Sequence, residues 1–172
     1  VSQSSNDTMH RRRKELFFFF ALILAGILLF FAVCFQVWVA QRHSLWGDEL
    51  DTITAVFRNW RGPKNFWWQI GQYPSAPPGD YLVERWLYRS GTLSWLYEPA
   101  EELFWRLPYI FLYTATCILT FLGSWRLTRS PFISFVAFSL MLTSQGPMVY
   151  ATETRFYSWL VFFMSASIWQ LL

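Results

Sequence analysis

Two short charged stretches stand beside long apolar runs and have residue types that could do chemistry. The first, "GDELD" at 47–51, places Asp48 and Asp51 three residues apart, on one face of a helix. A carboxylate there could take a proton from an acceptor hydroxyl, and the pair could hold a divalent cation through oxygen ligands. The alternative is structural, because Asp48, Glu49 and Asp51 would also cap a helix and complement its dipole.

The second stretch, "ETR" at 153–155, lies in a turn between two apolar runs. Arginine holds phosphate oxygens with two parallel N–H groups, and a lipid-linked donor offers a phosphate at headgroup depth. Arg155 could bind that phosphate, with Glu153 orienting its guanidinium. An ordinary interfacial turn is the alternative, since Tyr157 also suits the aromatic belt of a membrane. Lys64, beside the aromatic "NFWWQ", could shape a sugar or lipid groove or serve as an interfacial anchor.

The composition of the 172-residue chain indicates a membrane protein. The chain is 54% hydrophobic and 22% aromatic but only 15% charged, and it is too short to bury that much apolar surface within itself. We therefore expect membrane lipids as partners. The net charge of +3 comes largely from "HRRRK" at 10–14, which is typical of the cytoplasmic flank of a span. No nucleic-acid-binding motif accompanies this run, so nucleic acid is not an expected partner.

The apolar runs predict an all-α membrane protein with about four transmembrane helices. The expected spans are 16–40, 107–125, 131–149 and 156–172. The first run has no small-residue cleavage site after it, so we expect an uncleaved anchor instead of a signal peptide. The polar residues 1–15 should form a mobile basic segment ahead of the transmembrane module, 16–172.

Basic residues in short loops set the expected orientation. Arg126 and Arg129, in the link between the second and third spans, belong on the cytoplasmic side with the basic N-terminal run. The long loop 41–106 and the turn 150–155 must then lie on the opposite face. Both charged stretches therefore emerge on the same, non-cytoplasmic side of the membrane.

The long loop is expected to contain two short helices that lie in the headgroup layer. Helical spacing of apolar residues predicts them at 48–60 and 80–88, and a Gly-Pro breaker and a Pro-Pro-Gly breaker lie between the two helices. Arg106, at the start of the second span, should extend its charge to the headgroups. Cys34 and Cys117 lie inside apolar runs and are expected to be packing residues.

Four motifs follow one another along the chain: "SLWGDELDT", "PSAPPGDYLVERWLY", "EELFWRLPYIFLY" and "GPMVYATETRFYSWL". Their order resembles the N-terminal half of membrane glycosyltransferases of the GT-C superfamily. The most similar branch contains bacterial relatives of protein O-mannosyltransferases and of the lipid A aminoarabinose transferase. The resemblance runs from about Arg13 to Leu172.

This resemblance implies an inverting transfer of a sugar from a polyprenyl-phosphate donor, on the periplasmic side of a bacterial inner membrane. Asp48 matches the family's catalytic carboxylate, which activates the acceptor hydroxyl or holds a metal, and Glu49 matches its neighbour. Arg155 matches an arginine on the side of the lipid phosphate. Glu153 and Tyr157 match the flanking positions of the same motif.

Two departures from the family pattern support a second hypothesis. Ala76 stands where relatives often have a histidine before Pro77 and Pro78. The family's chains are also several times longer. The chain is therefore expected to be either the N-terminal part of a larger enzyme or a shortened, non-catalytic accessory subunit. In the second case its partners would be other subunits of a membrane complex, for example a photosynthetic or respiratory one.

Overall fold

The computed structural model describes residues 2–42, 78–91, 101–152 and 157–171. Every regular element in these ranges is a helix, and the same ranges contain no strand, which confirms the predicted all-α class for them. The helices are α1 (Ser2–Arg42), α4 (Pro78–Ser90), α6 (Glu101–Thr128), α7 (Pro131–Thr143), α8 (Gln145–Tyr150) and α9 (Tyr157–Leu171).

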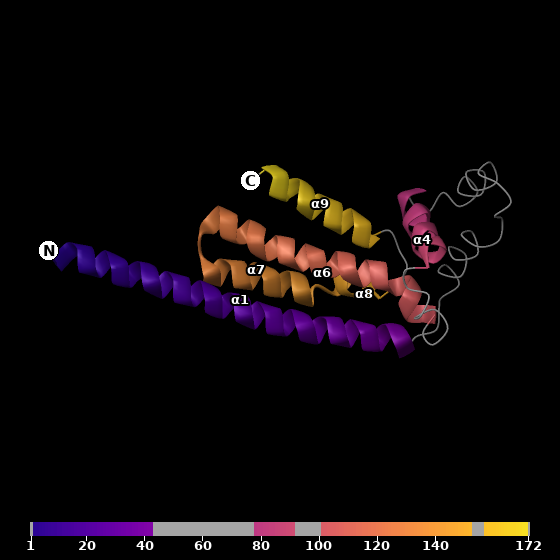
Figure 1. The fold of residues 1–172 in the computed structure, drawn as a ribbon, viewed down its shortest axis with the longest axis horizontal. Coiled ribbons are helices and arrows are strands. Elements are labelled where there is room, and N and C mark those ends of the chain that lie inside the picture. Colours follow the sequence, from indigo (N-terminus) through magenta and orange to yellow (C-terminus); the bar gives the residue numbers. More distant parts are fainter. Residues whose placement is uncertain (1, 43–77, 92–100, 153–156, 172) are drawn as a thin grey trace.

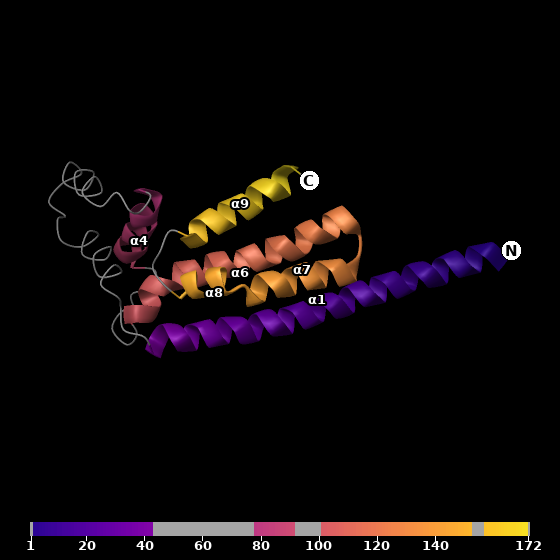
Figure 2. The same ribbon diagram turned by 180° about the vertical axis from the view of Figure 1, so that it is seen from behind.

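Helix α6 lies at the centre of the bundle, where it packs against α1, α7 and α9 and touches the short helix α8. Helix α1 also packs along α7. The long helices run side by side, with α1 and α6 antiparallel, and α4 lies at one end of the bundle (Figures 1 and 2).

Two of the described helices, α1 and α6, are long and apolar enough to cross a membrane. The qualifying segments are Glu15–Arg42 and Glu102–Thr128. Phe19, Phe20 and Phe31 are among many large apolar side chains of α1 that are exposed. Lipid is a more favourable solvent than water for such a surface, so these helices favour a membrane location.

Helix α1 begins well before the apolar run. It starts at Ser2 and continues without a break into that run, while the expected mobility of residues 1–15 stays a prediction. Extending an existing helix adds one backbone hydrogen bond for each residue fixed, and the "RRRKE" stretch consists of good helix formers. The polar residues therefore prolong the membrane helix beyond its apolar part.

The expected span at 131–149 is not one helix but two. Helix α7 ends at Thr143, and Ser144 has an extended backbone, with φ −63° and ψ 118°, before α8 begins. In a continuous helix the ring of Pro147 would clash with the carbonyl of Thr143 and could not donate to it. With 13 residues in α7 and 15 in the described part of α9, neither helix reaches the roughly 20 residues that span a bilayer core.

A tight turn joins α6 to α7. Arg129 has a positive φ of 51°, the left-handed conformation that often ends a helix, and its N–H donates to the carbonyl of Trp125 at 2.9 Å. Ser130 then caps α7, since its hydroxyl accepts a hydrogen bond from the N–H of Ile133. Pro131 occupies the first turn, where a missing N–H is tolerated. The start of the third apolar segment at Pro131 is thus confirmed.

The core of the bundle lies between α1, α6, α7 and α8. Its buried residues are Ala25, Tyr113, Cys117, Phe121, Phe138, Leu142 and Ala151. The rings of Phe18 and Trp125 lie 4.3 Å apart between α1 and α6, and those of Phe121 and Phe138 meet edge to face. Cys117 packs in this core as expected, whereas Cys34 is exposed on α1.

Candidate functional site

The end of the bundle where α1 ends and α6 begins is the part that bears on the predicted site. Helix α8 and the beginning of α9 lie at the same end (Figure 1). We call it the Arg106 end, after the buried arginine in the second turn of α6.

Only one of the predicted site residues, Tyr157, belongs to the described part of the chain. The others lie outside it: Asp48, Glu49, Asp51, Lys64, Glu153 and Arg155. Their roles stay predictions. The chain leaves α1 for 43–77, and enters α9 from 153–156, at the Arg106 end (Figure 1). The described helices therefore present the flanks of both charged stretches at one end of the bundle.

Arg106 joins α1 to α6. Its side chain is fully buried, and its Nη1 donates a hydrogen bond of 2.7 Å to the carbonyl oxygen of Ala40. Because α1 ends at Arg42, this carbonyl is among the last four of the helix and has no partner within it. A guanidinium also complements the partial negative charge at a helix C-terminus. The expectation that Arg106 extends to the headgroups is wrong, because the helix end provides a nearer acceptor.

Aromatic rings surround this contact. Trp105 is buried, with Phe104 edge to face at 4.9 Å between ring centroids. Tyr88 of α4 stacks against Trp105 with its centroid 6.2 Å away. The stacking ties α4 to the start of α6 beside Arg106.

Helix α4 confirms the predicted short helix at 80–88, and Gly91 follows it with a φ of +64° that suits a helix end. Partial burial, with the like charge of Arg89 one turn on, lowers the pKa of Arg85. A guanidinium nevertheless stays protonated at neutral pH. Helix α4 therefore brings two arginines to the Arg106 end, and two acidic residues of the same helix, Asp80 and Glu84, balance their formal charge.

Gln36 is a buried polar residue that the sequence analysis did not single out. It is fully buried one turn before Ala40 on α1, and neither atom of its amide has a hydrogen-bond partner among the residues that the structure describes. An unpaired buried polar group costs about 1–3 kcal/mol. A lone amide within a long apolar run was the available signal, since polar residues inside membrane spans are unusual.

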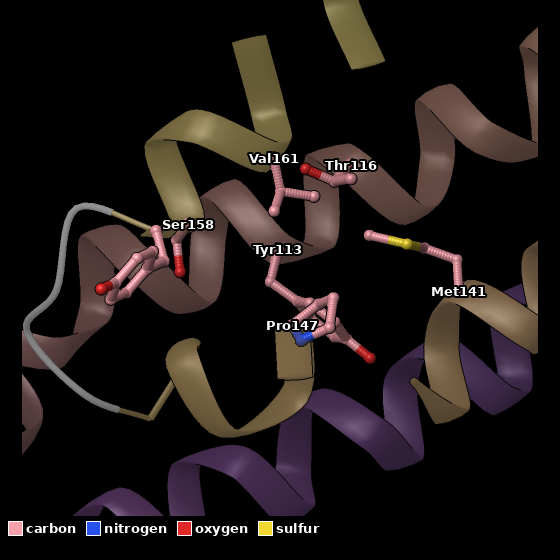
Figure 3. Close-up of a pocket in the computed structure, with 7 residues that line it drawn as sticks. Tyr113, Thr116, Met141, Pro147, Ser158 and Val161 are labelled. Carbon is pink, nitrogen blue, oxygen red and sulfur yellow. The ribbon is translucent and has the colours of Figure 1, made fainter. Parts of the chain in front are cut away.

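The start of α9 is held against the core by a seam of side chains from four helices. Figure 3 shows Tyr113 and Thr116 of α6, Met141 of α7, Pro147 of α8, and Ser158 and Val161 of α9 around one small cavity, which Tyr157 also lines. Its volume is about 10 Å³, close to the space of a single water. The cavity is too small for a sugar, so its lining serves to pack the start of α9 against α6, α7 and α8. The substrate-binding role of Tyr157 stays a prediction.

A metal site is not found in the described ranges, which contain no group of three or more His, Cys, Asp or Glu side chains able to hold an ion. The candidate ligands, Asp48 and Asp51, lie outside these ranges. The divalent cation therefore stays a prediction.

No protein-family model, curated protein or solved structure matches this chain. The class that the described residues define is a helical protein, and two of the helices in these ranges are long and apolar enough to cross a membrane.

Proposed function

We propose that this chain is the N-terminal part of an integral-membrane glycosyltransferase. The enzyme transfers a sugar from a polyprenyl-phosphate donor to an acceptor on the non-cytoplasmic face of a bacterial inner membrane. One observation carries the proposal. The C-terminal end of α1, which leads into the acidic stretch, and the N-terminal end of α9, which follows the Glu-Thr-Arg turn, both lie at the Arg106 end. In this topology the N-terminus is cytoplasmic, α7 together with α8 forms the third crossing, and α9 begins the fourth.

The chemistry divides between the two charged stretches. Asp48, with Glu49 beside it, takes the proton of the acceptor hydroxyl as that oxygen attacks the anomeric carbon of the sugar. The carbon–oxygen bond to the phosphate breaks with inversion, and polyprenyl phosphate leaves with the electron pair. Arg155 stabilises the charge on the leaving phosphate, with Glu153 and Tyr157 holding the guanidinium in place. A divalent cation bound by Asp48 and Asp51 would supply further positive charge there, and Lys64 would line the donor groove.

Contacts made by α6 support these two roles, because α6 holds both the end of α1 and the start of α9. Arg106 of α6 holds the carbonyl end of α1, which leads into the segment with Asp48. Tyr113 and Thr116 of α6 contribute to the seam that holds the start of α9, which follows Arg155. Positioning of this kind is worth much to a transfer reaction, because small misplacements of reacting groups cost large factors in rate.

The test is sugar transfer by the purified protein in vesicles that contain a polyprenyl-phosphate sugar. Asp48→Asn should lower turnover by about 10²–10⁴-fold, the usual contribution of a general base, with donor affinity kept. Arg155→Ala should weaken donor binding as well. Glu15→Gln, which changes a carboxylate at the cytoplasmic flank of α1, should leave transfer unchanged and serves as the control. Normal turnover by folded Asp48→Asn protein would remove Asp48 from the mechanism.

A non-catalytic accessory subunit of a larger membrane complex is the second candidate. The exposed apolar surface along α1 favours it, because neighbouring helices would cover that surface as well as lipid does. Purification from native membranes separates the two functions. Stoichiometric retention of other subunits, without any turnover of the lipid-linked sugar, would support the accessory role over catalysis.

A further inference from the structure

An apolar groove with a volume of about 450 Å³ lies between α1 and α7, away from the Arg106 end. Among its lining residues are Phe17, Phe20 and Leu24 of α1 and Pro131, Phe132 and Phe135 of α7. Phe17, Phe20 and Phe132 are each well exposed, so the groove is open along its side. Its size falls within the about 300–1,000 Å³ of typical small-molecule sites.

Two arginines stand at the end of this groove. Arg13 precedes Phe17 by four residues and Leu24 by eleven, a spacing that puts all three on one face of α1. Arg129 lies in the turn before α7, two residues ahead of Pro131. Both arginine side chains are exposed.

The register of α1 and α6 sets these arginines level with each other. The rings of Phe18 and Trp125 lie 4.3 Å apart and join the two antiparallel helices. Arg13 is five residues before Phe18, roughly 7.5 Å along the helix axis, and Arg129 is four residues after Trp125, roughly 6 Å in the same direction. The N-terminal part of α1 also continues past the turn between α6 and α7 (Figure 2).

We propose that this groove binds an anionic phospholipid from the cytoplasmic leaflet. One acyl chain lies against the phenylalanines of α1 and α7, and the phosphate is held between Arg13 and Arg129. Charge complementarity favours this occupant, since two guanidinium groups match the oxygens of a phosphate. A zwitterionic lipid brings its own cation to the same place and gains less. The proposal rests on α1 and α6 lying in a membrane with the N-terminus on the cytoplasmic side, as proposed above, and not on the sugar transfer.

The experiment is a lipid titration of the protein in detergent micelles, read by native mass spectrometry. Phosphatidylglycerol and phosphatidylcholine with identical acyl chains are the probes. We expect one tightly bound phosphatidylglycerol per chain and affinity for phosphatidylcholine at least about fivefold lower. Arg13→Gln and Arg129→Asn should each weaken phosphatidylglycerol binding by about fivefold, the usual effect of one basic residue near an anionic surface. Asparagine is chosen at 129 because it tolerates a positive φ.

Two further variants distinguish a built site from general attraction. Arg12→Gln removes the same charge from the neighbouring position, roughly 100° around the helix, and should change binding by less than about twofold. Leu24→Trp fills the groove without touching the charges and should abolish the tight site, with circular dichroism to confirm that the helices persist. Equal effects of Arg12→Gln and Arg13→Gln, equal affinity for both lipids, unchanged binding by Leu24→Trp, or a lipid-free dimer would each overturn the proposal.

Discussion

The guanidinium of Arg106 and the carbonyl oxygen of Ala40 form a buried hydrogen bond across 66 residues of sequence. Both residues are fully buried. A buried charge is costly unless it finds matching partners, and the end of α1 provides carbonyl groups with partial negative charge. The bond therefore does two things at once: it offsets the burial of Arg106 and it holds the last turn of α1 against α6.

Removing the Arg106 side chain tests the strength of this link. We expect Arg106→Ala to lower the free energy of unfolding by about 1.5–3 kcal/mol, the range for hydrogen bonds to charged groups. The measurement is denaturant unfolding in detergent micelles, followed by circular dichroism. Arg126→Ala is the matched control, because Arg126 is exposed and lies 5.4 Å from the ring centroid of Trp169. That contact should contribute only about 0.5–1 kcal/mol, so similar losses in the two variants would contradict a special role for Arg106.

Gln36 offers a prediction of the opposite sign. Its amide is fully buried without a partner in the described part of the chain, so Gln36→Leu should keep the side-chain volume and remove an unsatisfied group. We expect stability to rise by about 1–3 kcal/mol in the same unfolding assay. Gln170→Leu changes an exposed residue of α9 and should have little effect. A loss of stability in Gln36→Leu would mean that the amide has a polar partner.

Local signals account for the parts of the fold that the sequence predicted well. The apolar runs located α1 and α6, and the turn residues located α4 and the start of α7 at Pro131. The break between α7 and α8 at Ser144 was not predicted from the sequence, although Pro147 is only three residues further on. A hydropathy window averages over apolar residues and does not register a missing N–H, so it continued through the proline.

Long-range features could not be predicted in the same way. Arg106 was expected to extend to lipid headgroups, because nothing local shows that the end of a helix 66 residues earlier lies within reach. Of the candidate site, only Tyr157 falls in the described ranges, where it lines the seam at the start of α9. Residue types gave a chemical role to Asp48 and Arg155, but their meeting depends on tertiary structure that spacing does not encode.

The role of the Tyr113 hydroxyl at the junction between α7 and α8 can be tested by removing it. It donates a hydrogen bond of 2.6 Å to the carbonyl of Leu142, one residue before the end of α7, where the helix no longer supplies an N–H. Tyr113→Phe leaves that buried carbonyl unpaired and should lower stability by about 1–3 kcal/mol, with faster amide hydrogen exchange in α8 than in α6. Thr143→Ala removes an exposed hydroxyl that bonds only within α7, so it should change stability by less than about 0.5 kcal/mol. Uniform exchange across both helices would show that Tyr113 does not secure the junction.

The turn between α6 and α7 yields a pair of glycine substitutions with opposite expected signs. Arg129 adopts a φ of 51°, a left-handed conformation that costs a residue with a side chain roughly 1–2 kcal/mol, so Arg129→Gly should raise stability by about 1 kcal/mol. Leu127→Gly, two residues earlier in the last turn of α6, should instead lower it by about 1 kcal/mol, because glycine is a poor helix former. Thermal unfolding of both variants in the same detergent compares them directly. If Arg129→Gly were the less stable of the two, the contacts of the arginine side chain would outweigh its backbone strain.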